Sequence, residues 1–115
     1  MTVTTLGTAV EAVSLIVPTL SSPSMPYTLV LSDSDNKIIE LSSGTVNVPT
    51  NASVPFLIGA QIMFFQYGSG TVTFAGTAGV TVNATPGLKL RAQYSSATLI
   101  KRGTDTWLLT GDLSA

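Results

Sequence analysis

From residue 27 onward, short runs rich in β-branched and aromatic residues recur roughly every ten residues, with turn-forming residues between them. No window after residue 26 places apolar residues at the i, i+3, i+4 and i+7 positions of an amphipathic helix. The runs cover residues 27–31, 37–41, 45–48, 61–67, 71–74, 80–82, 88–94, 97–102 and 106–110. Short strands interrupted by Gly, Pro, Asn and Asp indicate an all-β domain, a β-sandwich of jelly-roll-like type.

Two of these segments carry more specific predictions. In residues 88–94, apolar or aromatic side chains alternate with polar ones, which predicts a strand with one buried face. The sequence Ser-Asp-Ser-Asp-Asn at residues 32–36 predicts a solvated turn between strands. The same residues resemble a fragment of a calcium loop. However, Ile38 and Gly44 stand where that loop requires Gly and Glu, so the turn is the better interpretation.

The first 26 residues differ from the rest of the chain. They hold one charged side chain, Glu11, and end in a stretch with prolines at positions 18, 23 and 26, which keeps the chain extended. The segment before the prolines suits a short helix from Thr8 to Ser14 or a strand. We interpret residues 1–26 as an extended N-terminal arm that packs on a neighbour and residues 27–115 as the β domain. A first strand of the same domain is an equally good alternative for residues 1–26.

The segment Ile-Met-Phe-Phe-Gln-Tyr at residues 62–67 predicts that the protein is an oligomer. Alternate side chains of a strand point to opposite faces, so large apolar groups lie on both faces of this one. Burying each such side chain is worth about 1.5–3 kcal/mol, which favours covering both faces. A second sheet covers one face, and the other needs the arm or another subunit. The predicted oligomer interface consists of Phe64, Phe65, Tyr67, Tyr94 and Trp107.

Composition supports association with other proteins. Only 10% of the 115 residues are charged and 44% are hydrophobic, whereas about 25% charged is usual in soluble domains. Such a surface leaves apolar patches that mark interaction sites. The formal net charge of -1 gives no basic surface for nucleic acid, and no apolar run is long enough to span a membrane.

The sequence contains few of the residue types that catalyse reactions or bind metals. It contains neither His nor Cys, which excludes Ser-His-Asp and Cys-His catalytic groups and the usual zinc sites. Asp33 and Asp35 lie in the predicted turn, where acidic residues are common without being catalytic. We therefore expect a protein that is not an enzyme, with no catalytic residues, no cofactor and no metal.

Several phrases of residues 27–115 resemble a β-rich module of tailed-bacteriophage virion proteins, of the tail-fibre, head-fibre and head-decoration types. They are Tyr-Thr-Leu-Val-Leu-Ser-Asp from residue 27, Gln-Tyr-Gly-Ser-Gly-Thr-Val-Thr-Phe-Ala from 66, Leu-Arg-Ala-Gln-Tyr-Ser-Ser-Ala-Thr-Leu-Ile-Lys from 90 and Thr-Trp-Leu-Leu-Thr-Gly-Asp-Leu from 106. The resemblance implies a trimeric building block of the virion and transfers no catalytic residue.

The function expected from this resemblance is a capsid decoration, or cement, protein. It would be made in the host bacterial cytoplasm and would bind, as a homotrimer, the major capsid protein on the exterior of the virion. The residues expected to dock on the capsid or another partner are Val10, Val13, Leu15, Ile16 and Val17. The alternatives are a tail- or head-fibre module that binds a host receptor, and an oligomeric scaffold or lectin unrelated to phages.

Overall fold

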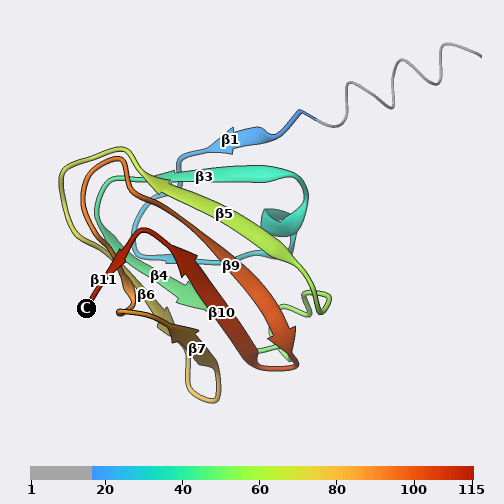
Figure 1. Cartoon of the computed structure of the whole chain (residues 1–115). Helices are drawn as coiled ribbons and strands as arrows, with labels where there is room; N and C mark the ends of the chain where they lie inside the picture. The colour runs from blue at the N-terminus through green and yellow to red at the C-terminus, as the bar shows by residue number, and fades with distance from the viewer. Residues whose placement is uncertain (1–16) are drawn as a thin grey trace, which may run out of the picture.

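The computed structural model describes residues 17–115, which form two β-sheets packed face to face (Figure 1). Within these residues the first sheet has the strand order β1-β3-β5-β9-β10-β7 and the second has the order β11-β8-β6-β4-β2. The described part contains one short 3-10 helix, η1 (Leu31–Ser34), and none of its helices is long and apolar enough to cross a membrane. The predicted all-β, two-sheet fold is confirmed. The strands are β1 (Thr19–Ser21), β2 (Tyr27–Thr28), β3 (Lys37–Leu41), β4 (Gly44–Val48), β5 (Gln61–Gln66), β6 (Val72–Gly76), β7 (Thr81–Ala84), β8 (Lys89–Leu90), β9 (Ser96–Gly103), β10 (Thr106–Gly111) and β11 (Leu113–Ser114).

The winding of the chain differs from that of a jelly roll. Successive strands from β1 to β6 alternate between the two sheets, so β1, β3 and β5 are parallel neighbours in one sheet and β2, β4 and β6 in the other. The later pairs are mostly antiparallel, including the β9–β10 hairpin and β5–β9, while β7 pairs in parallel with β10. A jelly roll is built from antiparallel Greek keys, so the jelly-roll-like detail of the prediction is not confirmed.

The core lies between the two sheets and follows the period-two pattern of the strands. In β5, Ile62, Phe64 and Gln66 are buried, while Gln61 and Met63 are exposed. Within the core, edge-to-face ring contacts join Phe64 to Phe74 between the two sheets and Phe56 to Trp107.

Two residues of the predicted oligomer interface belong to this core. Phe64 is 0% exposed and Trp107 is 1% exposed within the single chain. Their assignment to an interface between subunits is wrong. The physical reason is that both face the opposite sheet, which the sequence pattern alone does not distinguish from a partner subunit.

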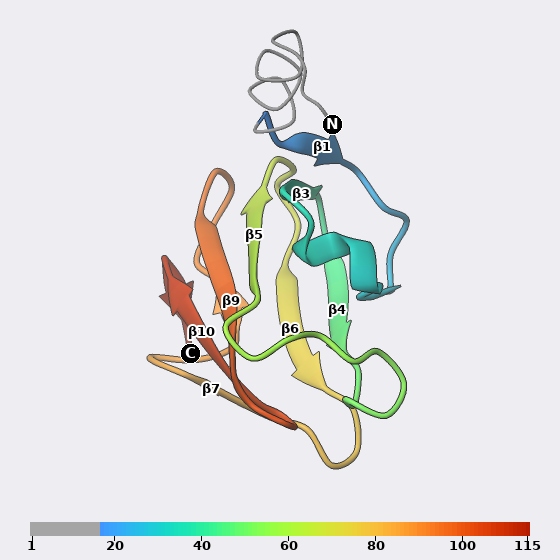
Figure 2. The same ribbon diagram turned by 90° about the vertical axis from the view of Figure 1, so that its right-hand side faces the viewer.

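The described part of the N-terminal segment contributes a strand to the sandwich. Strand β1 pairs in parallel with β3 at the edge of the six-stranded sheet, and Met25 packs against the core. For residues 19–21 the alternative of a first strand therefore holds, and the sandwich begins before residue 27. Figure 2 shows β1 at this edge.

Two local predictions are also corrected. The strand predicted for residues 88–94 is reduced to Lys89 and Leu90, because Tyr94 adopts a φ of 71° and the backbone turns between residues 91 and 95. The turn predicted for residues 32–36 overlaps helix η1. Its Asp33 is completely buried and not solvated. Residue 36 then takes the left-handed conformation at a φ of 55°, which Asn tolerates, and the chain enters β3.

Candidate functional site

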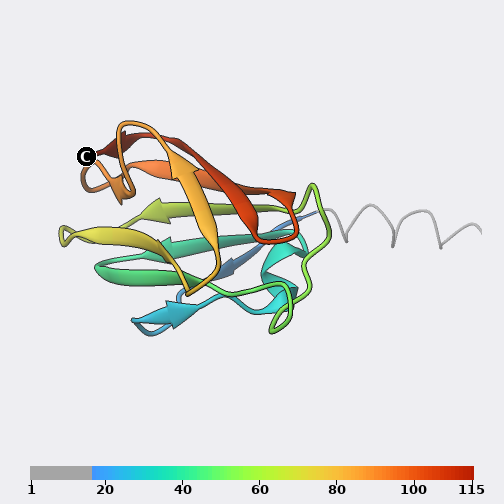
Figure 3. The same cartoon turned by 90° about the horizontal axis from the view of Figure 1, so that it is seen from below.

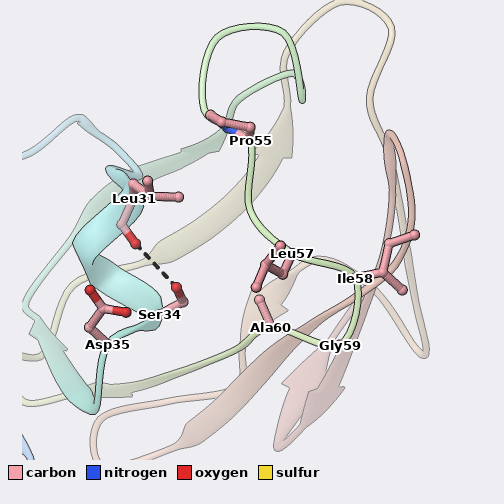
Figure 4. A pocket seen from close by; sticks show the side chains of 8 residues that line it. All are labelled: Leu31, Ser34, Asp35, Pro55, Leu57, Ile58, Gly59 and Ala60. Carbon is pink, nitrogen blue, oxygen red and sulfur yellow. Dashed lines mark hydrogen bonds between the residues drawn. The ribbon is translucent and has the colours of Figure 1, made fainter.

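Exposed apolar side chains gather at one end of the sandwich, around a shallow pocket of about 590 Å³ (Figure 4). Leu57 is 82% exposed, Ile58 67% and Leu31 50%. Helix η1 supplies one wall of the pocket, and the loop between β4 and β5 supplies the other. Figure 2 looks onto the end of the sandwich that carries η1 and this loop, and we call this end the apolar end. The pocket lining is Leu31, Ser34, Asp35, Pro55, Leu57, Ile58, Gly59 and Ala60.

Asp33 holds η1 in place from inside the sandwich. Its carboxylate accepts hydrogen bonds from the Tyr27 hydroxyl at 2.7 Å, the Val30 backbone N–H at 2.9 Å and the Lys37 ammonium at 2.8 Å. Burial, followed by the hydrogen bond to Asp33 and its charge, raises the pKa of Tyr27 well above its usual range. The wall that carries Leu31 is therefore fixed by charge-assisted bonds.

Lys101 holds the opposite wall. Its ammonium group is buried and donates to Asn51 Oδ1 at 2.6 Å and to the Phe56 carbonyl at 2.7 Å. It also lies 5.9 Å from the centre of the Trp107 ring. The Asn51 backbone N–H in turn donates to the Asp105 carboxylate at 2.7 Å. These bonds hold the loop on the side before Leu57, and on the other side the Gly59 N–H donates to the Lys101 carbonyl at 2.8 Å. Leu57 and Ile58 lie between these points and are exposed to solvent.

The N-terminal segment joins the sandwich at the same end. The Thr19 N–H donates to the Asn36 carbonyl at 3.0 Å, and Asp35 next to Asn36 lines the apolar pocket. Figure 3 shows the start of β1 at the end that carries η1 and the β4–β5 loop. Val17, the first described residue, is 73% exposed. The apolar end and the entry of the N-terminal segment thus form one continuous region.

A second apolar surface is the outer face of the six-stranded sheet. The register aligns Leu20, Ile38 and Met63 across β1, β3 and β5, with their side chains pointing away from the core. Met63 is 44% exposed and Leu20 58% exposed. We call this surface the outer apolar face, and it consists of Leu20, Ile38, Met63, Phe65, Ile100 and Leu108.

The corresponding face of the five-stranded sheet is more polar. Its register aligns Thr45, Thr73 and Lys89 in one row and Thr28, Asn47 and Ala75 in another. Of the two outward faces, only one carries large apolar side chains in the described residues. The six-stranded sheet therefore has the more apolar of the two outward faces.

The predicted site residues fall into three groups. Phe65, Tyr67 and Tyr94 lie at the surface, while Phe64 and Trp107 lie in the core. Val17 is exposed at the apolar end. The remaining predicted docking residues, Val10, Val13, Leu15 and Ile16, lie outside the described residues.

The sequence interpretation missed Leu31, Leu57 and Ile58. A signal for two of them exists in the sequence. The apolar run Phe-Leu-Ile at residues 56–58 is bounded by Pro55 and Gly59 and therefore belongs to a loop. Large apolar residues in a loop have no neighbouring strand to cover them, which favours their exposure.

Two ion pairs lie within residues 17–115, Lys37–Asp33 and Arg91–Asp112. No three side chains of the metal-binding types cluster within residues 17–115. The exposed Arg91 guanidinium donates to Asp112 at 2.8 Å, and this bond, followed by that from Ser95, lowers the pKa of Asp112.

Comparison with protein-family models found no match for this chain, and a search of curated proteins found none either.

Proposed function

We propose that this protein is a capsid decoration protein of a bacteriophage, which binds the exterior of the shell as a homotrimer and stabilises the head. The observation that supports it best is the apolar end, where Leu31, Leu57 and Ile58 are exposed beside the entry of the N-terminal segment. A protein that binds the assembled lattice in preference to loose subunits stabilises the lattice by mass action. The resemblance of residues 27–115 to virion modules supports the same assignment.

In this proposal the apolar end and the N-terminal segment bind the major capsid protein together. The segment supplies Val10, Val13, Leu15, Ile16 and Val17. The outer apolar face, separate from the apolar end, contacts the other subunits of the trimer. Phe65 belongs to that face, and Tyr67 and Tyr94 lie beyond the ends of its strands.

The test is to label the protein on intact virions of the phage that encodes it and to locate the label by electron microscopy. Label spread evenly over the head supports decoration. Absence of label from the head overturns the proposal. The full-length variant with Val13, Leu15 and Ile16 replaced by Asp should lose occupancy of the head while its β-sheet circular dichroism stays unchanged.

A matched pair of variants tests the apolar end. Ile58→Asp introduces a charge into the pocket wall, and we expect occupancy to fall at least about tenfold. Thr73→Asp places the same charge on the more polar face of the other sheet and should leave occupancy unchanged. Equal occupancy of the two variants would show that the apolar end does not contact the shell.

The alternative is a tail- or head-fibre module that binds a host receptor. One observation favours it, namely that Tyr67 and Tyr94 are 62% and 72% exposed at the other end of the sandwich. Label confined to the tail or to fibres in the same experiment would support this alternative.

A further inference from the structure

The end of the sandwich opposite the apolar end presents aromatic side chains on two neighbouring loops. Strand β5 starts at the apolar end and finishes at the opposite one, where Tyr67 follows it (Figure 1). Tyr94 lies in the loop before β9, and its N–H donates to the Gln66 carbonyl at 2.6 Å. The Gln93 side chain donates to the Tyr67 carbonyl at 2.9 Å. The two loops therefore form one surface.

A pocket of about 210 Å³ lies beside Tyr67. It combines the Tyr67 phenol with the Glu40 carboxylate and two serine hydroxyl groups, and neither Lys nor Arg lines it. The lining residues are Ser22, Pro23, Glu40, Leu41, Ser42 and Tyr67. Glu40 lies on the outward side of β3, paired with Phe65 of β5, so the pocket adjoins the outer apolar face. None of the lining residues belongs to the apolar end.

Glu40 is the most informative residue of this pocket. It is partly buried, and its carboxylate forms no ion pair or hydrogen bond with any side chain or backbone group of residues 17–115. The buried carboxylate of Asp33, by contrast, has three donors. A solvent-accessible carboxylate without a donor from the protein is an acceptor available for a ligand.

The backbone around the tyrosines is fixed. The Tyr67 N–H donates to the Leu41 carbonyl at 2.7 Å, and the Gln66 amide group donates to the carbonyls of Gly68 and Gly70. Tyr94 is held at a φ of 71°, a conformation that costs a bulky residue of order 1–2 kcal/mol. Such strain at an exposed aromatic residue points to a role outside folding.

We propose that this pocket binds one neutral pyranose ring of a carbohydrate. The apolar face of the sugar ring packs on Tyr67, and sugar hydroxyls donate to the Glu40 carboxylate. The other ligand classes fit less well. A calcium ion needs 6–8 oxygen ligands, a phosphate is repelled by Glu40, and a purely apolar ligand leaves that carboxylate unpaired. Tyr94 supplies a second ring for the next sugar of the chain.

The experiment is a titration of the full-length, isotope-labelled protein with glucose, galactose, mannose and N-acetylglucosamine, each followed by backbone amide NMR. We expect at least one sugar to give saturable shifts confined to residues 22–23, 40–42 and 66–67. Tyr67→Ala and Glu40→Gln should each weaken that binding about tenfold. Tyr67→Phe keeps the ring and should retain it.

Leu57→Ser at the apolar end is the matched control and should bind the sugar as the unmodified protein does. No saturable shift with any of the four sugars overturns the proposal, and so do shifts that persist in both Tyr67→Ala and Glu40→Gln. The inference does not depend on where the protein sits in a virion, so its failure leaves the decoration proposal standing.

Discussion

At the residue scale, Asp33 is the side chain on which the apolar end depends most. It is fully buried and accepts bonds from Tyr27, Val30 and Lys37. Asp33→Asn keeps the shape but leaves the Lys37 ammonium without its counter-charge, so we expect a loss of about 3 kcal/mol in the free energy of unfolding. Urea denaturation measures it. Asp35→Asn, two residues away and exposed, should change stability little, and equal losses in the two variants would contradict the role given to Asp33.

Tyr27 makes the stability of the protein depend on alkaline pH. Burial and the bond to Asp33 raise its pKa in the folded state above the ordinary value of about 10. The folded state therefore holds this proton more tightly than the unfolded state does. The resulting stabilisation is complete below about pH 10 and is lost as the pH rises through the folded-state pKa. Tyr27→Phe should flatten this alkaline decline in thermal melts, and an unchanged slope would contradict the explanation.

At the scale of elements, the strands that could be predicted are those whose pattern is local. Strand β3 matches the predicted residues 37–41, and β9 and β10 differ by a residue at one or both ends, because period-two alternation and turn residues define them. The sequence leaves strand β1 as one of two alternatives for its segment, and the end of β8 could not be predicted. Three residues of β1 are held by distant β3, and the chain after β8 is turned by Ser95, whose hydroxyl donates to Asp112. The apolar run at residues 56–58 can be recognised in the sequence, but its exposure depends on the position of the β4–β5 loop in the fold.

The β4–β5 loop is the element whose position depends on a buried cation. Lys101→Met keeps the aliphatic volume but removes both donors to the loop, at Asn51 Oδ1 and the Phe56 carbonyl. We expect a loss of about 2 kcal/mol and faster amide hydrogen exchange at Gly59, which is hydrogen-bonded to the Lys101 carbonyl. Arg102→Met, the exposed neighbour on β9, is the control. Unchanged exchange at Gly59 in Lys101→Met would mean that the loop is held by other contacts.

At the scale of the whole molecule, the two sheets have different outward faces. The six-stranded sheet presents Ile38, Met63 and Phe65, and the five-stranded sheet presents Thr45 and Thr73. The strand around Phe64 has large apolar side chains on both faces, and from this pattern the sequence predicts an oligomer. One of these faces is the core, which corrects the placement of Phe64 and Trp107. The side chains of the other face stay partly exposed within residues 17–115, so this face alone supports the prediction of a partner subunit.

This asymmetry predicts which single charge prevents self-association. Met63 lies centrally in the row Leu20–Ile38–Met63, and a Lys there must be desolvated if the outer apolar face is covered by another subunit. Light scattering after size-exclusion chromatography should give a trimer for the unmodified protein, a monomer for Met63→Lys and a trimer for Thr73→Lys. All three proteins should show the same sheet signal in circular dichroism, because both side chains point away from the core. A trimer that survives Met63→Lys but not Thr73→Lys would move the interface to the five-stranded sheet, and a monomeric unmodified protein would remove the trimer from the proposal.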